Sequence, residues 1–381
     1  MLADFYLLPC RESLCTFESV GPQSWISHPV IQVASFAFLK RCQFASMRHA
    51  LVTGATGFIG HHLVKRLLAE GTAVKCLVRS QARPAELSKH DVAFVHGDLA
   101  DVDSLAGAVK DVDVVYHLAG LTKSISNRDL MKVNGEGAGN ISRACSRLSC
   151  PPTLVVVSSL AAAGPSLGLE PRVETDRINP ISRYGQSKRA GELASMGFAD
   201  AVPTTIVRPP IVIGEYDRDG FQWFQMIRKL GFHLIPGLAN YNYSMIHADD
   251  LASALILAAE RGGRATPDAD DDAGVYFAAS DEVITYADLG RMIGNCLGRS
   301  RTPVVHAPMS MIWGVALSCD VWARLRRSPM ILNLDKVREA AAGGWACSSA
   351  KLQNHTGFVA GMSLEERLRQ TADWYVQENW L

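Results

Sequence analysis

Short apolar runs alternate with amphipathic segments along the chain from residue 50 to residue 208. The runs are nearly continuous, as in VDVVYHL at 112–118, which is typical of strands buried on both faces of a parallel sheet. The segments between them repeat their apolar positions with the period of a helix. This alternation predicts right-handed β-α-β crossovers and an α/β fold with a doubly wound parallel sheet. The predicted strands are 50–52, 73–78, 92–96, 112–118, 153–158 and 203–207, and the predicted helices are 58–70, 101–109, 129–147 and 184–198.

Three glycines follow the first predicted strand. In HALVTGATGFIG, at 49–60, Gly54, Gly57 and Gly60 separate this strand from a helix that begins near Phe58. Glycines suit a turn with unusual dihedral angles, and a helix N-terminus offers free N–H groups to a phosphate. An ordinary glycine-rich turn is the alternative. The order strand, turn, helix predicts a dinucleotide-binding Rossmann sheet whose ligand lies beyond the carboxyl ends of the strands.

The alternation of strands and helices loosens after residue 210. We therefore expect a dinucleotide-binding domain at 47–209, with 243–262 returning to it, and a smaller C-terminal substrate-binding lobe at 210–242 and 263–381. Residues 1–46 lack both helical and strand period, which predicts a poorly ordered N-terminal extension with the folded protein beginning near Met47. The upstream segment is then such an extension or the product of a misplaced start codon, and an atypical targeting sequence is the alternative.

The most apolar stretch is Val304–Cys319, which contains His306 and Pro308. A membrane-spanning helix needs about 20 apolar residues, so this stretch is too short to be one. It predicts a core helix or a pocket wall of the small lobe. The alternative is that residues 304–327 border a lipid-like substrate or touch a membrane surface, with Arg324, Arg326 and Arg327 near the headgroups.

Composition and charge indicate which classes of partner and which cellular compartment to expect. Lys and Arg together number 38, as do Asp and Glu, so the net charge is zero and a nucleic-acid partner is not indicated. The nine cysteines are scattered, without a C-x-x-C pair and without metal-like spacing against histidine. This usage predicts a reduced, cytoplasmic location and no metal site.

Tyr184 and Lys188 stand four residues apart in YGQSK, so a helix would place them on one face. A phenol has a pKa of about 10, and lowering it to about 7 requires roughly 4 kcal/mol of preferential stabilisation of the anion. A nearby ammonium group and an oxidised nicotinamide could supply it. Ser158 and Ser159 end the fifth predicted strand, where one hydroxyl could bond a reacting oxygen. Asn134 could hold a water that links Lys188 to solvent, or could bond the local backbone.

Eight segments, in their order and spacing, carry a family resemblance. They are TGATGFIG at 53–60, GDL at 97–99, YHLAG at 116–120, VNGEGAG at 133–139, SSLAAAG at 158–164, YGQSK at 184–188, RPPIVIG at 208–214 and HADDLA at 247–252. From Met47 to Leu381 the chain resembles an extended short-chain dehydrogenase/reductase of the NAD-dependent epimerase/dehydratase family.

The resemblance implies roles for individual residues. Ser159, Tyr184 and Lys188 would form the catalytic triad, with Asn134 beside them, and Ser159 is preferred to Ser158 because it stands five residues before Gly164. Asp98 and Leu99 would contact the adenine, and Ala119, Gly120 and Pro209 would lie along the ribose and nicotinamide. The full set of expected cofactor contacts is Gly54, Thr56, Gly57, Phe58, Ile59, Gly60, Arg79, Asp98, Leu99, Ala119, Gly120, Tyr184, Lys188 and Pro209.

Two departures from the family pattern bear on cofactor and substrate. Family members that use NAD(H) commonly carry an acidic residue at the end of the second strand, where this chain has Val78 followed by Arg79. An arginine there can pair with a 2′-phosphate, so we expect NADP(H) in preference to NAD(H). The run Leu160–Ala163 replaces the polar residues of sugar-nucleotide enzymes and resembles hydroxysteroid dehydrogenases and dihydroflavonol-type reductases. An apolar wall favours a hydrophobic small-molecule substrate.

The leading hypothesis is an NAD(P)-dependent oxidoreductase that transfers a hydride between nicotinamide and a carbonyl or alcohol, with Tyr184 as the acid and base. A nucleotide-sugar epimerase that uses the same triad is the first alternative. A non-catalytic dinucleotide-binding subunit is the second, because fold alone does not fix function. The resemblance also implies a homodimer paired through the helix that holds Tyr184.

Overall fold

The computed structural model describes residues 48–79, 87–166, 168, 170–326, 328, 330 and 332–381. The expectations for residues 1–46, for a start near Met47 and for Arg327 lie outside the described residues. Seven parallel strands form the main sheet in the order β10-β6-β5-β4-β1-β2-β3. These strands are β1 (His49–Thr53), β2 (Ala73–Val78), β3 (Ala93–His96), β4 (Val114–His117), β5 (Thr153–Val157), β6 (Thr204–Arg208) and β10 (Val275–Phe277).

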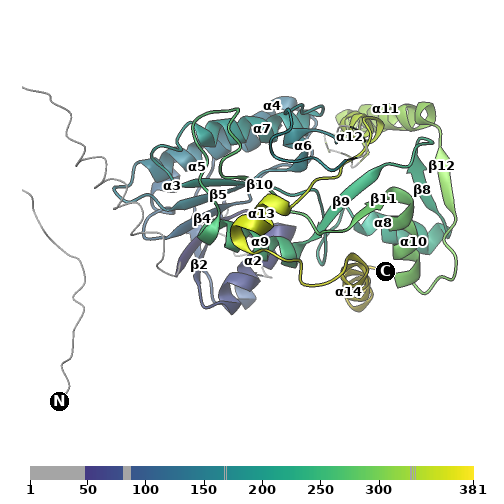
Figure 1. Cartoon of the computed structure of the whole chain (residues 1–381), viewed down its shortest axis with the longest axis horizontal. Coiled ribbons are helices and arrows are strands. Elements are labelled where there is room, and N and C mark those ends of the chain that lie inside the picture. The colour runs from purple at the N-terminus through teal and green to yellow at the C-terminus, as the bar shows by residue number, and fades with distance from the viewer. Residues whose placement is uncertain are drawn as a thin grey trace, which may run out of the picture. The chain divides into compact units, whose positions relative to one another are not determined.

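Helices cover both faces of this sheet (Figure 1). One face packs against α2 (Phe58–Ala69), α9 (Ala248–Arg261) and α13 (Ala350–Thr356). The other packs against α3 (Val102–Ala106), α5 (Gly137–Ser146) and α7 (Arg183–Met196). Burial on both sides explains why the strands are apolar throughout, and the predicted doubly wound α/β fold is confirmed. Shorter turns of helix are η2 (Leu87–Lys89), α4 (Asn127–Leu130), the π-helical η3 (Met131–Glu136) and α6 (Leu160–Ala163).

A smaller set of elements surrounds a separate apolar cluster. Its three-stranded sheet has the order β11-β9-β7, and a two-stranded sheet joins β12 to β8. The strands are β7 (Ile211–Ile213), β8 (His233–Pro236), β9 (Asn242–His247), β11 (Val283–Thr285) and β12 (Val304–Ala307). The helices are α8 (Phe221–Leu230), α10 (Tyr286–Cys296), α11 (Met309–Arg326), α12 (Leu334–Ala341) and α14 (Leu364–Gln377).

Two segments are placed differently from the expected domain division. Residues 275–277, expected in the substrate lobe, form β10 at the edge of the main sheet beside β6. All three of its residues are buried and apolar, as a strand covered on both faces requires. Of residues 243–262, α9 and Ile246 pack on the main sheet, whereas β9 itself pairs with β7 and β11 in the smaller sheet.

The apolar stretch at 304–319 is divided between β12 and α11 at Pro308. The expectation of a core helix is wrong, because Ala316 and Ala323 are the only buried residues of α11. Along the described part of the chain, none of the helices is long and apolar enough to cross a membrane. The cytoplasmic location and the homodimer stay predictions.

Candidate active site

The glycine turn after β1 has the shape that a phosphate site requires. Gly54 has φ +73°, and a Cβ built on it would lie 2.7 Å from the backbone nitrogen of Ala119. A Cβ on Gly60 would collide with the carbonyl oxygen of Gly54. Helix α2 starts at Phe58 after Gly57, with neither a side-chain cap nor an acidic residue in its first turn. Its first N–H groups and its dipole are therefore available to an anion, and these residues fit the pyrophosphate of a dinucleotide.

Apart from Tyr184 and Lys188 on α7, the expected cofactor contacts follow five strands of the sheet and lie at one edge of it, because parallel strands end on the same side. Ala119 donates its N–H to Thr53 Oγ1 at 3.2 Å, which ties the end of β4 to β1. Asp98 is exposed, and its Oδ1 accepts the N–H of Ala100 at 2.9 Å. The contacts follow the strands in this way: 54–60 after β1, Arg79 after β2, Asp98 and Leu99 after β3, Ala119 and Gly120 after β4, and Pro209 after β6. The predicted catalytic residue Ser159 follows β5 at the same edge.

Arg79 directly follows β2, and its side chain is exposed. Its carbonyl oxygen lies 2.7 Å from Nε2 of His96, which fixes the backbone at the end of β2 to the end of β3. The position occupied by an acidic residue in many NAD enzymes is Val78, so the guanidinium of Arg79 is the charged group at this strand end. An exposed guanidinium here is suited to a phosphate on the adenosine ribose.

Tyr184 lies in the first turn of α7, and the Ser159 hydroxyl is near enough to its phenol to stabilise the phenolate. Ser159 also caps α6, since its Oγ accepts the N–H of Ala161 at 3.2 Å. Burial raises the pKa of Tyr184, whereas the charge of Lys336 and the Ser159 hydroxyl act in the opposite direction. The neutral phenol is therefore favoured here, and a neutral phenol is able to donate a proton.

Lys188 lies one helical turn after Tyr184 on α7. Its Nζ donates to the carbonyl oxygen of Val157 at 2.6 Å. A Cβ built on Gly120 would lie 3.6 Å from this Nζ, so the ammonium faces the segment expected along the ribose. Burial lowers the pKa of Lys188 to about 8, and the carboxylate of Glu192 opposes that shift.

Asn134, in η3, is fully engaged with protein groups. Its Oδ1 accepts the N–H of Leu121 at 2.7 Å, and its Nδ2 donates to the carbonyl oxygen of Leu121 at 2.8 Å and to Ser187 Oγ at 2.8 Å. These bonds use both amide hydrogens, so the structure favours the second expected role, in which Asn134 bonds the local backbone.

Glu192 and Arg208 form a buried ion pair next to the predicted triad, and the sequence did not predict this pair. Ser158 Oγ donates to Glu192 Oε1 at 2.5 Å, and Arg208 donates to both carboxylate oxygens of Glu192 at 2.8 and 2.7 Å. Ser158 therefore binds a residue of α7, while the Ser159 hydroxyl lies near Tyr184. The available signal was that Glu192 stands four residues after Lys188, on the same face of the helix.

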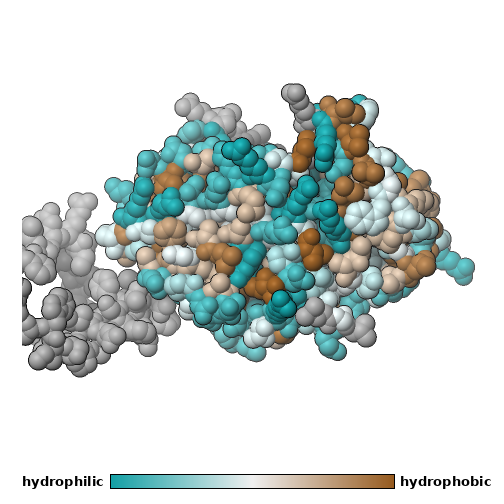
Figure 2. Space-filling view, turned by 90° about the horizontal axis from the view of Figure 1, so that it is seen from above, coloured by the Kyte–Doolittle hydropathy of each residue, from teal (hydrophilic) through white to brown (hydrophobic). Residues whose placement is uncertain are grey.

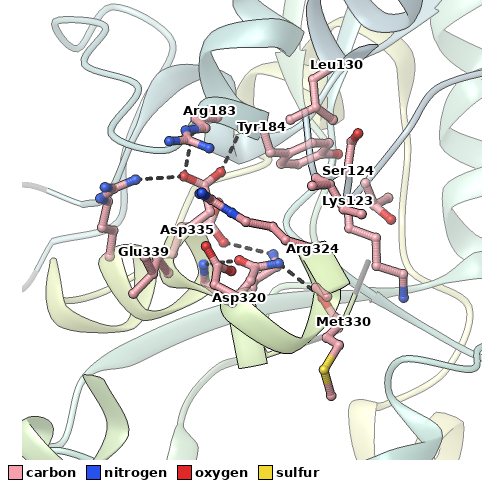
Figure 3. Close-up of a pocket in the computed structure, with 17 residues that line it drawn as sticks. Lys123, Ser124, Leu130, Arg183, Tyr184, Asp320, Arg324, Met330, Asp335 and Glu339 are labelled. Carbon is pink, nitrogen blue, oxygen red and sulfur yellow. Dashed lines mark hydrogen bonds and ion pairs between the residues drawn. The ribbon is translucent and has the colours of Figure 1, made fainter. Parts of the chain in front are cut away.

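A pocket beside Tyr184 is closed on one side by α11 and α12 (Figure 3). Asp335, from α12, accepts the N–H groups of Arg183 and Tyr184, both at 3.1 Å, and so binds the first turn of α7. Lys336 places its Nζ 5.8 Å from the centre of the Tyr184 ring. Both α12 residues are about 150 positions away in sequence, so no local pattern could have linked them to YGQSK.

A second cluster of titratable groups lies away from Tyr184. One ligand atom from each of His62, Glu215 and Asp249 lies within 4.8 Å of the others, which is compact enough for a metal. These groups already bond protein partners: His62 Nδ1 lies 2.6 Å from Asp249, and Asp249 also pairs with Arg367 at 3.5 Å. The cluster therefore ties α2, α9 and α14 together as an ion-pair network.

The family follows from the comparison with known proteins. A model of the NAD dependent epimerase/dehydratase family matches residues 50–269, which is more than half of the chain. The chain belongs to this family. Membership confirms the resemblance expected from the eight segments and makes the chain an enzyme of the extended short-chain dehydrogenase/reductase type.

Curated members of the family match nearly the whole chain. Ceramide reductase of Caulobacter vibrioides is 29% identical over 331 residues, which cover 87% of this chain and 95% of that protein. The 2-alkyl-3-oxoalkanoate reductase of Shewanella oneidensis is 27% identical over 344 residues, which cover 86% of each chain. Among solved structures, UDP-glucose 4-epimerase of Thermotoga maritima superposes with a TM-score of 0.67 at 21% identity, covering 87% of this chain and 99% of that one. The last likeness supports the fold.

Proposed function

We propose that this enzyme is an NADP(H)-dependent oxidoreductase that interconverts a carbonyl and an alcohol on a hydrophobic small molecule. The observation that carries the proposal is the position of Tyr184 in the wall of a pocket, with the Ser159 hydroxyl near its phenol and Lys188 one helical turn away. Two relatives that match the chain over most of its length are named reductases, which supports the same class of reaction. NAD(H) is the alternative cofactor.

The residues at the strand ends would hold the dinucleotide. Its pyrophosphate would bind the N–H groups at the start of α2, its adenine would lie near Asp98 and Leu99, and its nicotinamide end would lie near Pro209. A bound nicotinamide dinucleotide supplies the hydride in reduction and accepts it in oxidation. The structural fit is the uncapped α2 and the close approach of Gly54 to Ala119.

The side chains divide the proton chemistry among them. During reduction, the Tyr184 hydroxyl donates its proton to the substrate oxygen, and during oxidation the phenolate takes that proton back. Ser159 orients the substrate oxygen with its hydroxyl. The ammonium of Lys188 stabilises the phenolate, because opposite charges at close range favour the ionised form.

The pocket lining indicates a substrate with an apolar body and a polar end. Ile125, Leu130, Ala323, Met330 and Leu334 contribute apolar surface. The rest of the lining is polar or charged, and it includes Lys123 and Arg183 beside the charged groups of α11 and α12. Beside Tyr184, Leu160, Ala161 and Ala163 are packed in one apolar cluster, so polar sugar contacts are not available from α6. This combination favours a lipid-like ketone or alcohol over a nucleotide sugar.

Tyr184→Phe tests the proton chemistry. The variant keeps the ring and its packing but lacks the transferred proton, so we expect turnover to fall by at least about a hundredfold while cofactor binding is retained. Turnover is followed as net oxidation of the reduced cofactor in the near ultraviolet. Near-normal activity would contradict the assignment, and product formed without net cofactor change would indicate the epimerase. Retained cofactor binding without turnover of any carbonyl or alcohol by the wild type would indicate the non-catalytic subunit.

Arg79→Ala tests the cofactor preference. Hydrogen bonds to a charged group contribute about 1.5–3 kcal/mol, so we expect kcat/KM for NADPH to fall by about ten- to a hundredfold. The value for NADH should stay nearly constant, because NADH has no 2′-phosphate. Arg143→Ala, on the far end of α5, serves as the control for removal of a surface arginine. A wild-type preference for NADH would refute the assignment.

A further inference from the structure

The exposed face of α11 is apolar, which is unusual for a helix on a protein surface. Met311, Val315, Leu317, Val321, Trp322 and Leu325 are each at least 46% exposed. Ala316 and Ala323, seven residues apart, are the buried residues of the helix. Small residues therefore pack against the protein while large apolar ones face outward, the reverse of an ordinary amphipathic helix. Figure 2 views the molecule from the side on which α11 lies in Figure 1. It shows hydrophobic residues gathered at the upper right of that view.

We propose that the outward face of α11 docks on an anionic lipid bilayer and presents the mouth of the Tyr184 pocket to the membrane. This inference rests on the proposed function, in which the substrate is lipid-like. Within the described residues, α11 packs mainly against α12. The proposal gives the outward face of this helix the bilayer as its partner.

Charge and side-chain type favour a bilayer with anionic headgroups. Arg324 and Arg326 are exposed in the last turn of α11, and the guanidinium of Arg326 lies 4.6 Å from the ring centre of Trp322. Tryptophan and arginine together suit the boundary between acyl chains and headgroups, where an apolar ring and a cation find their preferred surroundings.

The size of the face argues against a second copy of the chain as the occupant. A helix of 18 residues is about 27 Å long and about 10 Å wide, so one face offers roughly 300 Å². A stable dimer buries about 800 Å² on each partner. Shallow insertion into a bilayer does not require a matching protein surface, and the area is sufficient for that.

The same helix borders the pocket. Asp320, Ala323 and Arg324 of α11 line it together with Tyr184, and Figure 3 shows Asp320 and Arg324 across the pocket from Tyr184. Docking of the outward face would therefore bring the lining of the pocket close to the bilayer surface. A lipid-like substrate would have a short path from the membrane to Tyr184.

The test compares two triple variants of the full chain. Leu317→Ser, Val321→Ser and Leu325→Ser, introduced together, remove a stripe that is 53 to 73% exposed and lies outside the pocket lining. Leu230→Ser, Val359→Ser and Val376→Ser, introduced together, form the control, because these side chains are 50 to 73% exposed on other elements. Binding is measured by co-sedimentation with vesicles of phosphatidylcholine containing phosphatidylglycerol, and with vesicles of phosphatidylcholine alone.

We expect the wild type and the control to bind the anionic vesicles, and the α11 variant to bind more than about tenfold more weakly. Equal binding of both variants would overturn the proposal, as would a wild type that does not sediment with vesicles. A wild-type dimer in light scattering that becomes a monomer only in the α11 variant would assign the face to a second copy. Activity on a short, water-soluble ketone separates the two proposals: if it persists while vesicle binding is absent, only the docking proposal fails.

Discussion

Glu192→Gln removes the negative charge from the buried ion pair beneath the active site. Glu192 is fully buried and Arg208 is 2% exposed, and two hydrogen bonds of 2.8 and 2.7 Å join them. Ser158 and Arg189 bond the same carboxylate at 2.5 and 3.0 Å. A glutamine has the same shape, but its NH₂ group would face a guanidinium that can only donate.

The expected loss of stability is large because the guanidinium of Arg208 would remain buried without its hydrogen-bonded counter-charge. Removing one partner of a buried ion pair costs about 3–5 kcal/mol. A domain is stable by about 5–15 kcal/mol in total, so the variant should lose a substantial fraction of it. Glu70→Gln is the matched control: its pair with Arg66 has a distance of 2.6 Å, but the two side chains are 39% and 51% exposed. An exposed pair of this kind contributes at most about 1 kcal/mol.

Urea unfolding followed by circular dichroism measures both variants against the wild type, with equal m-values as the condition for comparison. A cost for Glu192→Gln within about 1 kcal/mol of that for Glu70→Gln would refute the reasoning. A second readout is independent of stability. The charge of Glu192 raises the pKa of Lys188, so its removal should lower that pKa below its present value of about 8 and shift the pH dependence of activity.

Two further predictions concern Lys188 and Asp335. Since burial lowers the pKa of Lys188 to about 8, its ammonium is present below that pH and is lost as the pH rises through it, so kcat/KM for reduction should fall with increasing pH near 8. Lys188→Met should be slower, and its pH profile should lack the fall near pH 8. An unchanged fall in that variant would mean that another group is responsible for it. Asp335→Ala removes the acceptor of two N–H groups at the start of α7, so KM should rise about fivefold, equivalent to about 1 kcal/mol, with a smaller change in kcat. Asp335→Asn keeps one acceptor oxygen, so its KM in steady-state kinetics should lie between those of the wild type and Asp335→Ala. A change in kcat alone would contradict the positioning role.

The main sheet could be predicted because its signals are local. Each strand is an apolar run and each crossover helix has its own period, so β1 to β6 were found to within one or two residues. The placement of Gly54, Arg79, Asp98 and Ser159 at one edge then follows from the parallel direction of the strands. Their roles as cofactor and catalytic residues stay predictions, because the sheet fixes their neighbourhood and leaves the chemistry open.

The remainder depends on contacts between distant segments. Residues 275–277 form a three-residue apolar run that could suit either sheet, and only the free edge beside β6 decides its place. Arg208 belongs to the segment RPPIVIG in the sequence, but its pairing with Glu192 depends on how α7 packs on β5 and β6. For α11, hydrophobicity along the sequence was clear, but the side that faces the protein depends on whether Ala316 or its larger neighbours pack inward.

These contacts separate the chemistry of the site from its substrate selection. Tyr184, Lys188 and Glu192 lie on α7 and are fixed by the main sheet, whereas the opposite wall of the pocket is supplied by α11 and α12. Asp335 joins the two parts through the N–H groups of Arg183 and Tyr184. We therefore expect a change in the part of α12 away from Lys336 and Glu339 to affect substrate choice more than the pKa of Tyr184, while a change at Glu192 affects stability and the pKa of Lys188 together.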